Sequence, residues 1–311
     1  MITSIGFSAG KEIKAESNIS FLRIFRAFEA IVYTEIITLI IMKRLHSLLF
    51  ATMIFTSANA QKLPVVQEVS IYAPANVKIE GKVAEWGKLQ AYNKGRGLHY
   101  TIANDNSNLY LILQTDDVDA LAKITNRGIK FSINSEGKKN DEGAISFIYP
   151  FFDIDNRPYI SFKNKIKIDS NLPKTLSDAD SVMRVVNKRI NDRAKFIKVF
   201  GLPAIDTMLS VYNDTGIAAA QLFDNAMVYS YEIAIPLKLL KRVFNTVQTF
   251  NYHVTIPGLS LDDFASVKYG ANGMPLSITA RSAAGAALPA KDQMAATFAA
   301  TDFWGEYTLA K

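Results

Sequence analysis

Two neighbouring runs of residues, Leu98-His99-Tyr100-Thr101-Ile102-Ala103 and Leu109-Tyr110-Leu111-Ile112-Leu113-Gln114-Thr115, decide the fold class of this chain. Both runs are rich in β-branched and aromatic residues, which favour strands, and the first alternates between apolar and polar positions. The segment between them, Asn104-Asp105-Asn106-Ser107-Asn108, consists of residue types that form turns. The stretch therefore predicts an antiparallel hairpin with a polar loop.

Runs of the same kind recur along the chain between turn signals. They lie at 128–134, 144–150, 196–200, 208–212, 216–223, 227–235, 247–256, 276–280 and 304–309. Many short strands at this spacing predict a mainly β fold, an immunoglobulin-like or jelly-roll β-sandwich. We expect residues 61–311 to form one such domain.

One inserted helix interrupts the series of strands. Ser177 can cap it, and Asp178 and Asp180 would lie in its first turn, where the helix dipole favours anions. Apolar residues then recur at helical spacing, at Val182, Val185, Val186 and Ile190. We expect this helix to belong to an insertion near 170–195. A second insertion, at 258–302, is rich in Ala, Gly and Ser and reads as a long loop.

The composition excludes several classes of protein. The 311 residues include no cysteine, which rules out disulfides, thiolate metal sites and a cysteine nucleophile. The formal charge of +6 is spread along the chain and not gathered in runs, which argues against a nucleic-acid partner. The chain also has no nucleophile elbow, P-loop or dinucleotide fingerprint. No catalytic constellation is visible, which favours a non-enzymatic protein.

Residues 42–60 have the layout of a secretory signal peptide. Met42-Lys43-Arg44 supplies the positive start, and Leu45 to Phe55 supplies the apolar stretch. That stretch is too short to span a bilayer by itself, which takes about twenty residues. Ala58-Asn59-Ala60 has the small residues of a cleavage site. We expect export to the periplasm or the exterior, with cleavage after Ala60.

Residues 1–41 form an N-terminal extension with two interpretations. In the first, translation starts at Met42 and not at Met1, so the extension is a misassigned start. In the second, the apolar segments Ile31 to Ile41 and Leu45 to Phe55 form a membrane-embedded pair with charges at the interface. Both interpretations place residues 61–311 outside the cytoplasm. Cleavage after Ala60 would leave this part of the chain with no stable membrane span.

Four segments carry a resemblance to a known family. They are Val77-Lys78-Ile79-Glu80-Gly81-Lys82-Val83-Ala84-Glu85-Trp86, Asn108-Leu109-Tyr110-Leu111, Tyr231-Glu232-Ile233-Ala234-Ile235-Pro236-Leu237 and Phe303-Trp304-Gly305-Glu306-Tyr307-Thr308-Leu309. In order and spacing they resemble the family 9 carbohydrate-binding modules and related sandwich domains, from Ile71 to the end of the chain. The resemblance implies a β-sandwich that binds polysaccharide or oligosaccharide.

The resemblance also implies two tryptophans that enclose the sugar, and here the chain departs from the pattern. The first region, 123–127, has no aromatic residue, and the second, 296–301, offers only Phe298. We therefore name other ligand-binding candidates. Trp304 and Tyr307 can stack on a sugar ring, although core packing is the alternative for Trp304. Arg127 can give paired hydrogen bonds to hydroxyls or a carboxylate.

Alternatives to a binding module remain at this point. A structural or interaction protein of the cell envelope would use the sandwich to hold a protein partner, and a secreted hydrolase acting on glycans would need two facing carboxyl groups. We expect no cofactor, with Ca²⁺ as the one candidate because it prefers oxygen ligands. The carboxylates in question are Asp116, Asp117, Asp119, Asp153 and Asp155.

Overall fold

The computed structural model describes only part of the chain. The described residues are 33–44, 62–95, 97–135, 137–158, 160, 176–244, 248–260, 263, 265–280 and 294–311. The chain divides into two compact units, Met1–Lys62 and Leu63–Lys311. In the first unit residues 33–44 form a helix. Within these ranges no helix is both long enough and apolar enough to cross a membrane. The expected signal peptide lies outside the described residues except for 42–44.

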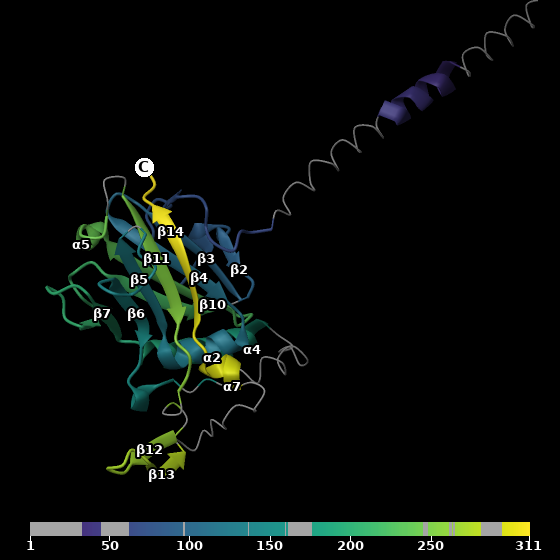
Figure 1. The fold of residues 1–311 in the computed structure, drawn as a ribbon. Helices are drawn as coiled ribbons and strands as arrows, with labels where there is room; N and C mark the ends of the chain where they lie inside the picture. The colour runs from purple at the N-terminus through teal and green to yellow at the C-terminus, as the bar shows by residue number, and fades with distance from the viewer. Residues whose placement is uncertain are drawn as a thin grey trace, which may run out of the picture. The chain divides into compact units, whose positions relative to one another are not determined.

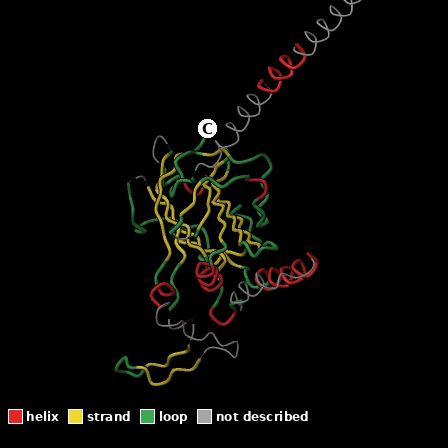
Figure 2. The backbone as a smooth tube through the Cα atoms, turned by 90° about the vertical axis from the view of Figure 1, so that its right-hand side faces the viewer, coloured by secondary structure: helices red, strands yellow, loops and turns green. Residues whose placement is uncertain are grey.

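The second unit is a mainly β sandwich, which confirms the predicted fold class (Figures 1 and 2). Two six-stranded sheets, which we call A and B, form the sandwich. The strands of sheet A are, in order, β1 (Ile71–Tyr72), β3 (Leu98–Asn104), β4 (Asn108–Thr115), β10 (Tyr229–Pro236) and β9 (Ala218–Phe223). Strand β2 (Ala91–Asn93) pairs with β3 beside this row. Sheet B contains, in order, β14 (Thr301–Thr308), β11 (Thr249–Ile256), β5 (Ile129–Ser135), β6 (Ile145–Phe151), β7 (Phe196–Phe200) and β8 (Met208–Ser210). A separate hairpin pairs β12 (Ala265–Tyr269) with β13 (Pro275–Ala280) inside the segment expected to be a long loop.

The predicted hairpin forms the centre of sheet A. Strands β3 and β4 pair antiparallel with Tyr100 opposite Leu113, and both side chains are buried in the main core. The apolar side chains that alternate along each strand fill the space between the sheets, which is why most of the strands are buried on that face. Across this core the hydroxyl groups of Tyr100 and Tyr252 lie 3.0 Å apart, so one hydrogen bond joins sheet A to sheet B.

The predicted inserted helix is α4 (Leu176–Asn191), and it covers an edge of sheet A. The Asn187 side chain donates to the Phe223 carbonyl at 2.8 Å and accepts from the Phe223 amide at 2.7 Å. Phe223 lies on the edge strand β9, whose open backbone groups would otherwise offer a template for pairing with another chain. The helix thus closes part of that edge. The Ser177 side chain, predicted to cap it, lies outside the described residues.

A second helix, α2 (Val118–Arg127), lies in a segment for which we predicted no element. Asp117 caps it, because its carboxylate accepts from the Ala120 amide at 2.8 Å. Leu121 and Ile124 point into the core. Figures 1 and 2 show α2 across the ends of the strands. Asp116, Asp117 and Asp119 were considered only as candidate Ca²⁺ ligands, so the helix start at Asp117 was missed.

Short helical segments also occur in the described part of this unit. They are η2 (Ala84–Trp86), α5 (Leu237–Leu240) and α7 (Met294–Phe298). A further turn, η3 (Ile154–Asn156), follows β6. Helix α7 packs beside α2 at one end of the sandwich, whereas α5 continues from the end of β10.

The opening segment is held on the outer face of sheet A by one buried carboxylate. Glu232 of β10 is fully buried and accepts hydrogen bonds from Trp86 Nε1 at 2.7 Å, the Gly81 amide at 2.7 Å and the Glu80 amide at 3.1 Å. Burial raises the pKa of Glu232 above 4.5, and these three donors offset part of that effect. Trp86 also packs against Tyr110, with ring centroids 5.3 Å apart. Two segments that carry the family resemblance therefore meet at one carboxylate.

Gly81 is the residue that this contact constrains most, and we predict that Gly81→Ala destabilises the fold by about 3 kcal/mol. Its φ is +82°, and an added Cβ would lie 2.6 Å from the backbone carbon of Gln221. Gly87 is the matched control, because its φ is +61° but an added Cβ meets nothing within 4 Å. Gly87→Ala should cost only about 1 kcal/mol. Urea unfolding of both variants measures the difference, and equal losses would contradict this account.

Candidate functional site

The outer face of sheet B carries an aromatic stack at its edge. Trp304 lies on the edge strand β14, opposite His253 of β11. The two rings are parallel within 12°, with centroids 4.0 Å apart. The flanking residues Phe303 and Gly305 are buried, so strand alternation turns Trp304 outward. Its indole is partly exposed, and no strand of the sheet lies on its other side.

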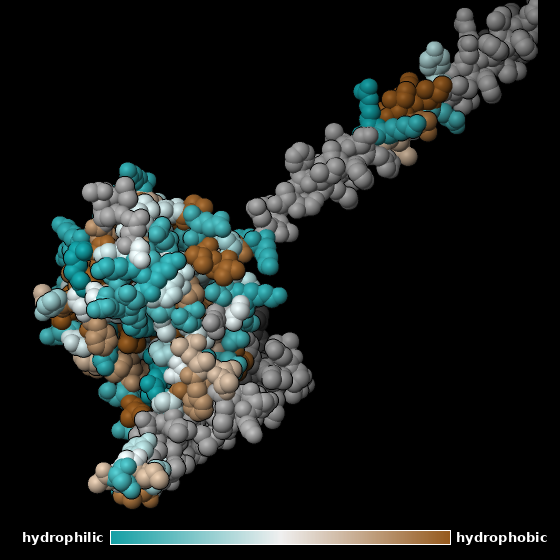
Figure 3. All heavy atoms as spheres, in the orientation of Figure 1, coloured by the Kyte–Doolittle hydropathy of each residue, from teal (hydrophilic) through white to brown (hydrophobic). Residues whose placement is uncertain are grey.

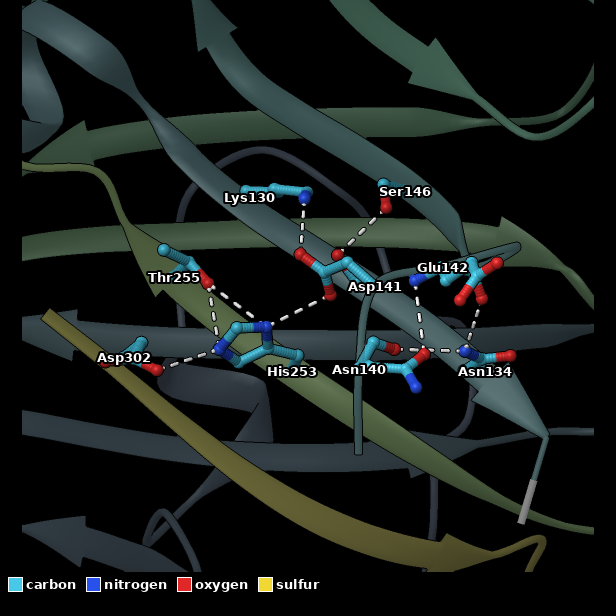
Figure 4. A network of polar contacts seen from close by, with 10 residues as sticks. Lys130, Asn134, Asn140, Asp141, Glu142, Ser146, His253, Thr255 and Asp302 are labelled. Atoms are coloured by element: carbon cyan, nitrogen blue, oxygen red, sulfur yellow. Dashed lines mark hydrogen bonds and ion pairs between the residues drawn. The ribbon is translucent and has the colours of Figure 1, made fainter. Parts of the chain in front are cut away.

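Two carboxylates hold the imidazole of His253 in place (Figure 4). Nδ1 lies 3.1 Å from Asp141 and Nε2 lies 3.0 Å from Asp302, and the His253 side chain is only 11% exposed. Thr255 adds its hydroxyl group 3.2 Å from Nε2. Both ring nitrogens can donate to carboxylates only when each carries a proton. Each ring nitrogen thus faces a carboxylate, and the imidazole is a fixed support beside Trp304.

Asp141 reaches this face because the loop between β5 and β6 folds back over the sheet. The Asn134 side chain donates to the carbonyls of Asn140 and Glu142, both at 3.0 Å, and the Gly137 amide donates to Asn251 at 3.1 Å. Asn134 and Asn251 are buried beneath the loop. These hydrogen bonds fix the described part of the loop over the sheet.

Lys130 completes the site from β5. Its Nζ donates to Asp141 at 2.6 Å, on the side of that carboxylate away from His253 (Figure 4). Burial by itself would raise the pKa of Asp141, but the hydrogen bonds from Lys130 and His253 outweigh it and hold the pKa below 3.8. Asp141 and Asp302 remain 35% and 39% exposed, so both can still accept hydrogen bonds from a ligand beside the indole.

The structure does not bring the three predicted ligand-binding residues together. Tyr307 lies in the core, 4% exposed. Its hydroxyl group donates to the Ile71 carbonyl and lies 3.0 Å from the Asn104 side chain, so it ties the closing strand to sheet A. The same alternation that turns Trp304 outward turns Tyr307 inward. We therefore build no ligand contact on Tyr307.

Arg127 ends helix α2 and is engaged in an ion pair. Its guanidinium donates to Asp263 at 2.7 Å and to the hydroxyl group of Ser260. Arg157 binds the other oxygen of the same carboxylate, which is 1% exposed. Burial would raise the pKa of Asp263, but the hydrogen bonds from Arg127, Ser260 and Arg157 lower it overall. Arg127 thus holds the segment around Asp263, away from Trp304.

The acidic residues considered for Ca²⁺ have other surroundings. Asp117 caps α2, and Asp116 and Asp119 line a cavity of about 620 Å³ at the end of the sandwich. Tyr92, Lys94 and Lys123 line the same cavity. Among the described residues, no group of three or more acidic, histidine or cysteine side chains is arranged to hold a metal ion. Asp153 and Asp155 lie around the short turn η3.

Trp304 was among the predicted ligand-binding residues, but the groups around it were not. His253, Asp141 and Asp302 are separated by up to 161 positions, and no motif joins them. The one available signal was strand alternation, which places Asp302, Trp304 and His253 on an outer face once β11 and β14 are known to pair. Asp141 had no signal at all, since its position depends on the path of a loop.

Comparison with known proteins adds no relative. No protein-family model matches the chain, and no curated protein matches it.

The ion pairs of Asp141 make a pH-dependent contribution to stability. A carboxyl group whose folded pKa is lowered stabilises the fold above its unfolded pKa and loses that effect as the pH falls through the folded value. We therefore predict that Asp141→Asn lowers the free energy of unfolding at pH 7 by about 1 kcal/mol. The deficit should shrink once the pH falls below 3.8.

Chemical denaturation at pH 7 and at pH 3 tests this expectation. Glu142→Gln is the matched control, because Glu142 lies on the same loop with an exposed side chain. It should leave the stability unchanged within about 0.5 kcal/mol. A deficit of the same size at both pH values in Asp141→Asn would contradict the role assigned to the charge.

Proposed function

We propose that the chain is an exported β-sandwich module that binds carbohydrate on the outer face of sheet B, with Trp304 as its stacking platform. The observation that carries the proposal is the Trp304–His253 stack, 4.0 Å between centroids, held between the carboxylates of Asp141 and Asp302. The stack offers the apolar face of the Trp304 indole, with the carboxylates of Asp141 and Asp302 beside it. Ligand sites combine these two elements, the first for contact area and the second for orientation.

The stack suits a sugar because of how it is supported. A pyranose ring has an apolar face of C–H groups and a rim of hydroxyl groups, so it can lie on an indole and donate to carboxylates beside it. His253 fills one side of the Trp304 indole and limits its rotation, which reduces the conformational entropy lost on binding. The exposed carboxylates of Asp141 and Asp302 then accept hydrogen bonds from the rim.

Binding and not hydrolysis is the function that this geometry supports. Asp141 is engaged by Lys130 and His253, and the imidazole is itself held between two carboxylates. A general acid must hold a proton near neutral pH, whereas the pKa of Asp141 is lowered. The groups beside Trp304 are therefore placed for recognition.

A glycan-array screen with the purified chain tests the proposal. We expect binding to a defined neutral polysaccharide, weakened about tenfold or more by Trp304→Ala, because a stacked aromatic ring supplies much of the contact. His253→Gln should weaken binding less, since it removes the support and leaves the indole. Thermal unfolding of each variant confirms that it is folded.

Tyr92→Ala is the matched control for Trp304→Ala. Tyr92 stacks on His99 with centroids 4.1 Å apart, so it is also an aromatic ring on a histidine, but it lies on sheet A beside the end cavity. We expect Tyr92→Ala to bind normally. Loss of binding in Tyr92→Ala alone would move the site to the cavity, and no glycan binding by the folded protein would overturn the proposal.

Export is the second part of the proposal, and it rests on residues 42–60. A chain carrying a C-terminal tag, produced in a bacterium, should be recovered outside the cytoplasm with Gln61 as its first residue. N-terminal sequencing of the purified product measures this. Ala58→Leu should block processing, because the cleavage site requires small residues. A product from the unaltered chain that retains Met1 or Met42 would contradict the predicted cleavage.

A further inference from the structure

A second aromatic surface lies on sheet B, at the edge opposite Trp304. We call it the β7 strip, and it comprises Phe151, Phe196, Phe200, Met208, Tyr212, Lys195 and Lys198. Four of its apolar side chains are markedly exposed: Phe196 at 41%, Phe200 at 42%, Met208 at 38% and Tyr212 at 81%. Figure 3 shows brown spheres among the teal ones on the side where Figure 1 places β6 and β7. Single exposed apolar residues are ordinary, but a cluster of aromatic ones marks a binding surface.

The β7 strip follows from the alternation of strand β7. Phe196, Lys198 and Phe200 point outward, while Ile197 and Val199 point into the core. Side chains two positions apart on a strand are separated by about 7 Å, so the two phenyl rings lie about 13 Å apart with the lysine between them. Across the sheet, Phe151 of β6 lies opposite Phe196. The result is an open row of rings and not a pocket.

The charges in the strip are all positive. Nζ of Lys198 lies 4.8 Å from the ring centroid of Phe151 and 5.7 Å from that of Phe200. Nζ of Lys195 lies 5.7 Å from the centroid of Tyr212. In the described part of the chain neither lysine forms a salt bridge with a carboxylate. The charge of Lys195 helps to lower the pKa of the nearby Asp192, so Lys198 is the ammonium group whose charge we assign to a ligand.

We propose that the β7 strip binds an acidic polysaccharide, one whose sugar rings carry carboxylates. The rings of such a polymer would stack on Phe196 and Phe200, and a carboxylate between them would pair with Lys198. An extended polymer fits an open row of this kind, since each repeat presents an apolar ring face and one negative charge. A second copy of this chain fits less well, because it would bring Lys195 and Lys198 against their own counterparts.

The chemistry of the strip separates it from a nucleic-acid site. Nucleic-acid binding typically rests on about six to ten phosphate contacts, and the strip offers two lysines. The strip is also distinct from the Trp304 platform. Strand β7 lies four strands from β14, which places the two sites about 19 Å apart. The proposal extends the carbohydrate role inferred above to this second site, yet it can be tested without it.

The test measures binding of the purified chain to sodium polygalacturonate by isothermal titration calorimetry at low salt. We expect Lys198→Met to weaken binding about tenfold, because it removes a charge-assisted contact. Phe200→Ala should weaken it about threefold through loss of stacking. Fully methyl-esterified polygalacturonate, which has the same backbone without the charge, should bind at least about tenfold more weakly than the acid form.

Matched variants make the outcome specific. Lys88→Met removes an exposed lysine elsewhere on the molecule and should leave binding unchanged. The Trp304 platform is tested on a neutral polysaccharide and the β7 strip on polygalacturonate with the Lys198 and Phe200 variants, so failure of the one and failure of the other are distinguishable. Equal losses in Lys88→Met and Lys198→Met would show general charge attraction and overturn the proposal. Equally tight binding of poly-glutamate or of single-stranded DNA would overturn it as well, as would no binding to polygalacturonate.

Discussion

The hydrogen bonds accepted by Glu232 organise the outer layer of this sandwich. A carboxylate with no exposure to water is costly unless its oxygens are satisfied, and here three donors from the opening segment satisfy them. The donors include two consecutive amides, so the chain must turn sharply at Gly81, where φ is positive. The donors belong to the segment from Glu80 to Trp86, and the acceptor belongs to β10. The contact therefore fixes how this opening segment lies on sheet A.

That constraint has a consequence for the position of the functional surfaces. The opening segment covers the outer face of sheet A, where Trp86, Tyr110 and Ala234 form a small second core. The outer face of sheet B receives no such layer in the described part of the chain and is covered only by the loop that carries Asp141. Both surfaces that we assign to ligands, the Trp304 platform and the β7 strip, lie on this less covered face.

The two surfaces differ in their electrostatics, although they share one sheet. Around Trp304, Asp141 forms a salt bridge with Lys130, and Asp141 and Asp302 both contact the imidazole of His253. At the β7 strip the Lys195 and Lys198 ammonium groups lie beside aromatic rings, and among the described residues Lys198 forms no salt bridge with a carboxylate. A glycan with both neutral and acidic segments could contact both surfaces, with the Asp141 loop between them.

The sequence by itself determined the fold class, because strand alternation and turn residues are local properties. It placed the hairpin of β3 and β4, strand β7 and helix α4 close to where the structure has them. It missed helix α2, since an acidic cap followed by a short amphipathic run also reads as a polar loop. Trp304 was named from its aromatic type and its position in the closing strand, whereas its partners His253, Asp141 and Asp302 were not named as ligand-binding residues. Only the tertiary structure decided those contacts, because they depend on which strands pair and on where a loop folds, and neither is encoded in the spacing of residues along the chain.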